Sequence, residues 1–142
     1  MISKIINNEE FKNAIRVGFN EDNVIYSLYC PKVKVLCIDD IIDDIFNRIK
    51  SDTRNITIKG VYEKNKLIGY HAYDDKTLIS FALNTNYRSR KYLHAFWDLI
   101  SKDLRGGFDA FMWTINQRGI KWLLKNNMKI GDSDNLITHL IF

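Results

Sequence analysis

The chain has 142 residues, of which 46% are hydrophobic and 27% charged, and its formal net charge is +4. These values are typical of a single globular domain over residues 1–142 that buries about two-thirds of its unfolded surface. The mostly apolar runs, such as residues 136–142, are far shorter than the roughly 20 residues of a membrane-spanning helix, which argues against a membrane protein. The mild positive charge favours anionic partners only weakly.

The first half of the chain predicts one strand and two helices. Residues Ile2–Ile6 have the composition of a short strand, and residues 7–19 carry apolar side chains at helical spacing after a capping asparagine, Asn7 or Asn8. Residues 38–50 place isoleucines on one helical face and aspartates on the other. We expect the acidic face to be solvated or to recruit a cationic amine.

Two segments between these helices are ambiguous. Residues 24–30 and 33–38 are strand-like in content but are also compatible with an extended loop or a helix edge. They contain the only two cysteines, Cys30 and Cys37, and no histidine lies nearby to complete a zinc site. We therefore expect reduced core thiols and no metal centre.

Three apolar strands follow one another in the second half, joined by short polar connections of the hairpin kind. They span residues 55–63, 66–73 and 76–83, and they predict an antiparallel meander. The next helix carries a stripe of apolar residues from Leu93 to Leu104 and is expected to end at the glycines at 106–107.

The chain then alternates between strand and helix. Residues 108–115 are apolar on both faces, as in a central strand, residues 117–127 predict a helix, and residues 136–142 predict a closing strand. The whole order is strand, helix, helix, three strands, helix, strand, helix, and then one or two strands. It indicates an α/β protein with a mixed sheet.

Cations gather where the helix after the meander begins. Three of the four residues 88–91 are cations, namely Arg88, Arg90 and Lys91, and they come directly before the apolar stripe. Positive side chains at a helix N-terminus oppose its dipole by roughly a few tenths of a kcal/mol, so their presence favours a bound anion such as a phosphate. The alternative is a solvated helix start without a ligand.

Several of these features resemble the GNAT N-acetyltransferase fold, by motif over residues 56–142 and by element order over the first 50 residues. In that family the loop after the strand corresponding to residues 78–84 reads R/Q-x-x-G-x-G/A. Here Arg88 matches the first position, but Lys91 and Leu93 replace the two small residues. A second family pattern, N-x-x-A-x-x-x-Y-x-K, matches at Asn116 and Lys125, while Leu123 stands in place of the tyrosine that protonates the departing thiolate.

The resemblance implies a GNAT-like mixed central sheet, an antiparallel meander plus a splayed parallel pair, flanked by helices. It also implies an acyl-CoA-dependent N-acetyltransferase, with acetyl-CoA as donor and an unidentified amine as acceptor. Asn116 would equally serve as the N-cap of its helix. The residues expected to bind acetyl-CoA are Ala82, Leu83, Asn84, Arg88, Ser89, Arg90, Lys91, Tyr92 and Asn116.

Catalysis in such a protein would be direct transfer from the thioester to the amine. His71 is the candidate base, with His94 as an alternative, because imidazole titrates near neutral pH. Tyr87 or Tyr92 would have to supply the missing acid, with Tyr70 as a third candidate.

A competing interpretation assigns no chemistry to the fold. Within the family, the stretches RSRKY and IKWLLKNNM look most like small acetyltransferase-like proteins of short-tailed bacteriophages. The protein would then be a structural module, or one that binds a phage or host protein. Under either interpretation we expect a cytoplasmic location, in the host cytoplasm or the virion if a phage encodes the protein. A basic stripe could contact nucleic acid, but no groove-reading motif accompanies it, which argues against that partner. The stripe consists of Arg118, Lys121, Lys125 and Lys129.

Overall fold

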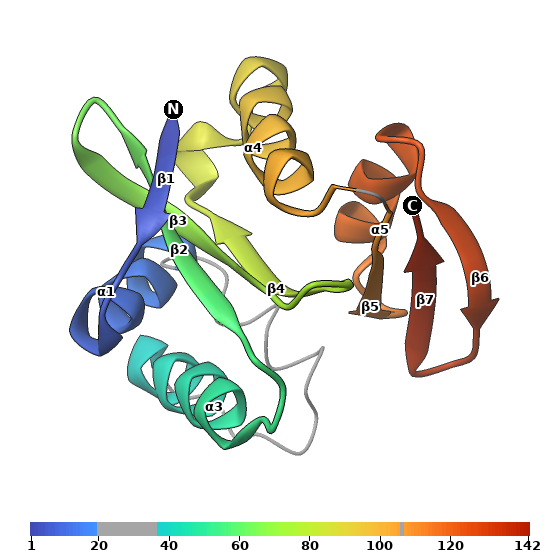
Figure 1. Cartoon of the computed structure of the whole chain (residues 1–142), viewed down its shortest axis with the longest axis horizontal. Helices are drawn as coiled ribbons and strands as arrows, with labels where there is room; N and C mark the ends of the chain where they lie inside the picture. Colours follow the sequence, from blue (N-terminus) through green and yellow to red (C-terminus); the bar gives the residue numbers. More distant parts are fainter. Residues whose placement is uncertain (20–36, 106) are drawn as a thin grey trace.

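A seven-stranded sheet in the order β1-β2-β3-β4-β5-β7-β6 runs through the computed structural model, which describes residues 1–19, 37–105 and 107–142 (Figure 1). Over the described residues the predicted order of strands and helices is confirmed, with two strands after the last helix. The ambiguous residues 24–30 and 33–36 lie outside the described residues. In chain order the elements are β1 (Ile2–Ile5), α1 (Asn8–Gly18), α3 (Ile38–Ser51), β2 (Thr57–Glu63), β3 (Lys66–Tyr73), β4 (Thr77–Leu83), η1 (Thr85–Tyr87), α4 (Arg90–Asp103), β5 (Asp109–Trp113), α5 (Gln117–Lys125), β6 (Lys129–Ser133) and β7 (Ile137–Ile141).

The meander forms as its short connections predicted. β2, β3 and β4 pair antiparallel with their neighbours, and β1 adds to the free edge of β2. At the turn between β2 and β3, Lys64 and Asn65 have φ values of 49° and 66°. Two consecutive residues with positive φ are characteristic of the tight turn whose twist matches that of a hairpin.

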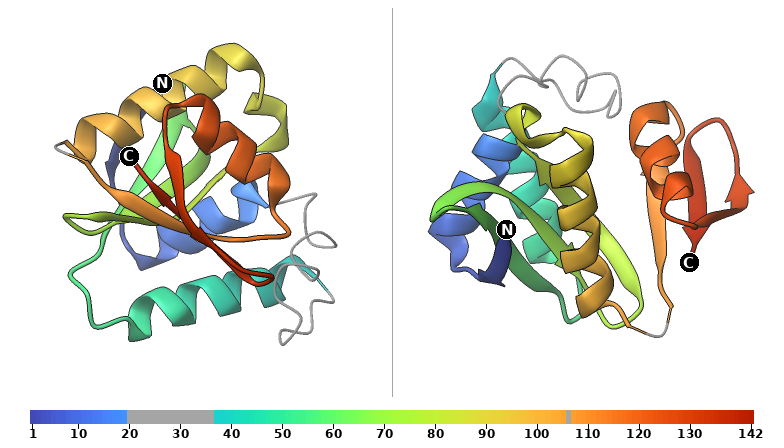
Figure 2. Two further views of the ribbon diagram at one scale, coloured as in Figure 1. Left: turned by 90° about the vertical axis from the view of Figure 1, so that its right-hand side faces the viewer. Right: turned by 90° about the horizontal axis from the view of Figure 1, so that it is seen from above.

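The helices cover both faces of the sheet (Figures 1 and 2). α1 and α3 pack on one face, where Phe11, Ile41 and Tyr70 are fully buried. α4 and α5 contribute to a second core on the opposite face. The N-cap of α1 is Asn7, whose side chain forms a capping box with Glu10, so of the two predicted candidates Asn7 caps the helix and Asn8 is its first residue. Within the described ranges, no helix is both long and apolar enough to cross a bilayer.

Two expectations about burial were wrong. β5 is not covered on both faces, because Ala110 is buried whereas the neighbouring Phe111 is 52% exposed. Among the described helices, α1 packs over β2, β3 and β4 (Figure 1). Phe111 of β5 stacks on His139 of β7. Cys37 is not a core thiol either, since it is exposed at the N-cap of α3.

The sheet is divided between β4 and β5. These two strands form the only parallel pair among the described strands. Their pairing consists of Thr77 opposite Asp109 and Leu78 opposite Ala110. Beyond these positions β4 stays paired with β3, and β5 stays paired with β7. The two strands therefore splay apart, as Figure 2 shows from above. Beyond Leu78, the edge of β4 that faces β5 is therefore paired with none of the described strands.

Candidate active site

The candidate site begins at the edge of β4 that β5 leaves unpaired. The backbone N–H of Asn84 donates to the carbonyl of Ile68 on β3 at 2.8 Å. Because backbone groups alternate in direction along a strand, the N–H and C=O groups of Phe81 and the N–H of Leu83 point the other way, toward the splay. The carbonyl of Leu83 accepts a hydrogen bond from Nε of Arg88. An extended ligand that carries amide groups can pair with such an edge.

α4 begins a few residues after this edge and brings positive charge to it. Its N-cap, Ser89, is extended and makes no side-chain capping hydrogen bond, and its first turn contains no acidic residue. Arg90 and Lys91 occupy that turn and are exposed. The free amides and the positive end of the helix dipole thus coincide with two cationic side chains, which favours a bound anion.

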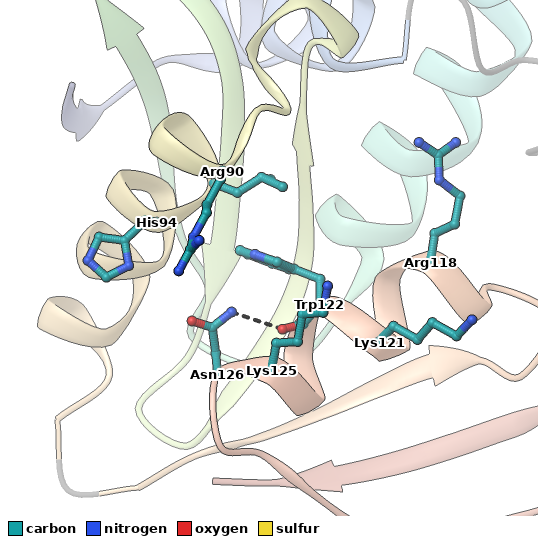
Figure 3. A pocket seen from close by; sticks show the side chains of 8 residues that line it. Arg90, His94, Arg118, Lys121, Trp122, Lys125 and Asn126 are labelled. Atoms are coloured by element: carbon teal, nitrogen blue, oxygen red, sulfur yellow. Dashed lines mark hydrogen bonds between the residues drawn. The ribbon is translucent and has the colours of Figure 1, made fainter.

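A groove of about 820 Å³ lies between α4 and α5 (Figure 3). Arg90 extends from α4 toward α5 (Figure 3). Three cations of the basic stripe also line the groove, from α5, with Arg118 and Lys121 pointing away from α4 in this view. These three recur at intervals of three and four residues, which places them on one face of their helix. The groove is lined by Arg90, Leu93, His94, Arg118, Lys121, Trp122, Lys125 and Asn126.

Trp122 gives the groove an aromatic wall. Its ring stacks on Phe96 of α4 with centroids 5.7 Å apart, and it contacts Phe81 of β4 at 5.5 Å. It also meets Trp97 edge-on at 5.8 Å. The groove therefore combines cations that can bind phosphates with a flat apolar surface that leads back to β4.

Asn84 and Arg88 lie at the end of β4 but contact α1. The Nδ2 atom of Asn84 donates to the carbonyl of Val17 at 2.8 Å. Arg88 donates from Nε to the carbonyl of Leu83 at 2.7 Å and from Nη2 to the carbonyl of Gly18 at 3.2 Å. The structure thus brings both side chains to backbone carbonyls, while Arg90, two residues further on, lines the groove.

His71 is on β3, as predicted, but its side chain is fully buried. Its Nε2 atom lies 3.1 Å from Oδ2 of Asp103, near the C-terminal end of α4, and Oδ1 of Asp103 accepts from Lys59 at 2.8 Å. Burial lowers the pKa of His71. Burial alone would raise the pKa of Asp103, but its hydrogen bonds with Lys59 and His71 lower it. A catalytic role for His71 would require the site to open, whereas His94 is exposed on the groove.

The three candidate tyrosines occupy two different environments. Tyr87 and Tyr92 meet edge-on, with ring centroids 5.1 Å apart, on either side of the start of α4. Tyr70 is fully buried among the residues under α1 and α3, and its hydroxyl lies 2.8 Å from that of Ser80. Burial raises its pKa. Tyr87 and Tyr92 are therefore better placed than Tyr70 to meet a ligand at α4.

The second family motif also has a structural explanation. Asn116 is the N-cap of α5, and its Oδ1 atom accepts from the N–H of Gly119 at 3.0 Å. Leu123 is fully buried in the core. The contact of Asn116 with a ligand stays a prediction, because the cap alone explains the residue. In the part of the chain that is described, no three His, Cys, Asp or Glu side chains are grouped so as to hold a metal ion.

The sequence matches no family model and no curated protein sequence, but solved structures resemble it over nearly its whole length. An acetyltransferase from Thermus thermophilus has a TM-score of 0.72 and 11% identity, covering 100% of this chain and 97% of its own. The GNAT domain of S. lividans PAT has a TM-score of 0.68 and 12% identity, covering 99% of this chain and 88% of its own. The chain has the GNAT fold.

A third structure adds a bound ligand. The N-acetyltransferase PseH of Campylobacter jejuni, in complex with acetyl coenzyme A, has a TM-score of 0.59 and 12% identity, covering 99% of this chain and 98% of its own. Identities this low establish the fold and leave the activity to be argued from the chain's own residues. The α/β sheet expected for a GNAT fold, a meander plus a splayed parallel pair, is confirmed.

Proposed function

We propose that this protein is an N-acetyltransferase that uses acetyl-CoA as donor and an amine as acceptor. The observation that carries the proposal is the open edge of β4, which leads to a cationic groove at the start of α4. The GNAT fold supports it, as does the acetyl coenzyme A bound to the similarly folded PseH. Acetyl-CoA carries amides in its pantetheine arm and phosphates at its far end, which are the groups that these two features can bind.

The proposal divides the binding residues by their chemistry. The backbone of Ala82, Leu83 and Asn84 would accompany the pantetheine arm, and Asn116 would meet it from the start of α5. Ser89, Arg90, Lys91 and Tyr92 would present their amides and cations to the pyrophosphate. Lys91 and Leu93 replace the small residues of the family loop, so side-chain charge would take over part of what backbone amides do there.

The proposed reaction is direct transfer. Bound acetyl-CoA supplies an activated acyl thioester. The amine nitrogen forms a bond to the carbonyl carbon, the carbon–sulfur bond breaks, the amine gives a proton to a base, and the thiolate takes one from an acid. Tyr87 or Tyr92 is proposed as the acid. For the base, His94 needs no rearrangement, while His71 would have to be uncovered first.

Isothermal titration of the protein with acetyl-CoA and with CoA tests the proposal. We expect binding at micromolar to high micromolar concentration. No heat in that range would refute the acetyl-CoA claim and with it the proposed enzyme.

A binding protein without catalysis is the second candidate. It is favoured by the buried Leu123, which cannot supply the proton that the family tyrosine supplies, and by the altered loop at Lys91 and Leu93. Binding of acetyl-CoA without release of free CoA across a panel of primary amines would support this candidate. A phage or host protein as partner stays a prediction.

A further inference from the structure

The C-terminal end of α1 is attached to the open end of β4 by two side chains. Asn84 donates to the carbonyl of Val17 at 2.8 Å, and Arg88 donates to the carbonyl of Gly18 at 3.2 Å. Both carbonyls lie in the last turn of α1, where backbone acceptors lack a donor within the helix. These contacts join residues 67 and 70 positions apart, so they are tertiary and not local.

The same two side chains also shape the connection from β4 to α4. Oδ1 of Asn84 accepts from the N–H of Asn86 at 3.0 Å, and Nε of Arg88 donates to the carbonyl of Leu83 at 2.7 Å. Each side chain therefore has one contact within the connection and one on α1. We call this set of four hydrogen bonds the clasp.

Close packing between α1 and β4 supports the clasp. A Cβ atom at Gly18 would lie 2.7 Å from the Cβ atom of Ala82, so the end of α1 rests directly against β4. Ser89, the N-cap of α4, immediately follows Arg88. A shift of the clasp would therefore move the first turn of α4 relative to the edge of β4.

We propose that Asn84 and Arg88 are positioning residues, which clasp α1 to the β4–α4 connection and thereby fix the first turn of α4 for the phosphates of its ligand. The ligand rests on the proposed function, but the clasp can be measured without one. Arg88 thus acts through the backbone of its neighbours, and Arg90 and Lys91 make the contact with phosphate. The planar fork of arginine suits two carbonyls at once, whereas lysine offers the same charge at a single point.

Hydrogen–deuterium exchange on the ligand-free protein is the first test. In Arg88→Lys and Arg88→Met, amides at the end of α1 and in residues 84–92 should exchange at least about tenfold faster than in the wild type. Arg90→Met should leave the end of α1 unchanged. Wild-type exchange at both segments in both Arg88 variants would overturn the clasp.

Asn84→Asp provides a second route if the Arg88 variants do not fold. It keeps the Oδ1 acceptor for Asn86 and removes the donor to Val17, so faster exchange is expected at the end of α1. Unchanged exchange there would count against the clasp.

Binding of CoA at two ionic strengths separates positioning from phosphate contact. Arg88→Lys should weaken CoA and dephospho-CoA by the same factor, about three- to tenfold, with the salt dependence of the wild type. If Arg88→Lys binds like the wild type while Arg88→Met loses both affinity and salt dependence, Arg88 contacts phosphate and the positioning role is wrong. If the wild type binds no CoA, the proposed function fails, and the exchange experiment still decides whether the clasp exists.

Discussion

Arg90 is the residue that we expect to contribute most side-chain binding energy to a phosphate. It is the first residue of α4 and lines the groove opposite the cations of α5. Arg90→Ala should weaken CoA binding by about 1–3 kcal/mol, because a charged hydrogen bond is lost. It should also reduce the salt dependence of the affinity, measured by titration at low and at physiological ionic strength.

Arg16→Ala is the matched control for Arg90→Ala. Arg16 is an exposed cation of α1 that pairs with Asp39, so its removal changes the net charge equally at another place. The control should leave CoA affinity close to that of the wild type. Dephospho-CoA should bind the wild type more weakly than CoA does. Equal binding of the two ligands, or an affinity independent of salt, would show that Arg90 and Lys91 are solvated cations at the start of α4 and do not contact phosphate.

His71 should make the stability of the protein depend on pH. Burial lowers its pKa below the ordinary value of 6.5, which it regains on unfolding. Between the folded pKa and 6.5 the unfolded chain therefore binds more protons than the folded one. The free energy of unfolding should fall as the pH drops through this window and change no further on this account below the folded pKa.

The variant His71→Phe separates the contribution of His71 to the pH dependence of stability from the contributions of the other histidines. The free energy of unfolding, measured with denaturant at a series of pH values below 6.5, should fall with falling pH more steeply in the wild type than in His71→Phe. The pKa values of Asp103 and Asp52 are lowered from 3.8, so these carboxylates stay ionised in the folded protein at pH values from 6.5 down to about 4. Parallel pH profiles for the two proteins would show that His71 is not held neutral in the folded state.

At the scale of elements, the pairing of β3 with β4 requires glycine at position 69. A Cβ atom there would lie 2.2 Å from the carbonyl oxygen of Ala82 and 3.0 Å from Cα of Leu83, and both are backbone atoms. Gly69→Ala should therefore destabilise the protein by about 3 kcal/mol, at the upper end of typical overpacking costs, as measured by denaturant unfolding.

Gly131→Ala is the control for the same substitution in another strand. A Cβ atom at Gly131 would meet Cδ1 of Ile141 at 2.6 Å, and that atom ends a flexible side chain that is 46% exposed. The side chain can move aside, so we expect a loss below about 1 kcal/mol. Equal losses in the two variants would show that the backbone of β4 can move aside for a Cβ atom at position 69, and that glycine is not required there.

Most elements could be predicted because their signals are local. The turn at residues 64–65 and the isoleucine spacing of residues 38–50 indicate a hairpin and a helix without knowledge of the rest of the chain. Burial could not be predicted in the same way. The apolar pattern of residues 108–115 suggested two covered faces, but whether a helix reaches the outer face of β5 depends on where α1 and α3 pack.

The candidate site could be predicted only in part, because some of its signals are local and others depend on packing. The cations at residues 88–91 are recognisable in the sequence because they stand at the start of a helix, and Arg90 does line the groove. The cations of α5 were considered only as a possible contact for nucleic acid, because the groove that they share with Arg90 is formed by the packing of α5 beside α4. In the sequence Arg88 could not be distinguished from Arg90 and Lys91 as a phosphate-binding cation. Its partner Gly18 lies 70 residues away, so no local pattern indicates their hydrogen bond.

At the scale of the whole molecule, two parts of the sheet meet over a short junction. Only two residue pairs join β4 to β5 within the described sheet, and the hydroxyl of Thr77 reinforces them by donating to Asp109 at 2.6 Å. Side chains must therefore supply much of the attachment. Trp122 of α5 is central to it, because its ring contacts Phe81 of β4 and Phe96 of α4.

Removing this ring should weaken the attachment of the part formed by β5–β7 and α5. We expect Trp122→Ala to lower the free energy of unfolding by about 2–4 kcal/mol, somewhat less than for a fully buried tryptophan because Trp122 is only partly buried. Hydrogen exchange in α5 and β5 should then become faster than in β2 and β3, since the two parts no longer open as one unit. Leu124→Ala, on the same helix but 39% exposed, is the control and should change neither quantity appreciably. Uniformly faster exchange in both parts of Trp122→Ala would show that the sheet unfolds as a single unit and that the two strand pairs suffice to couple its parts.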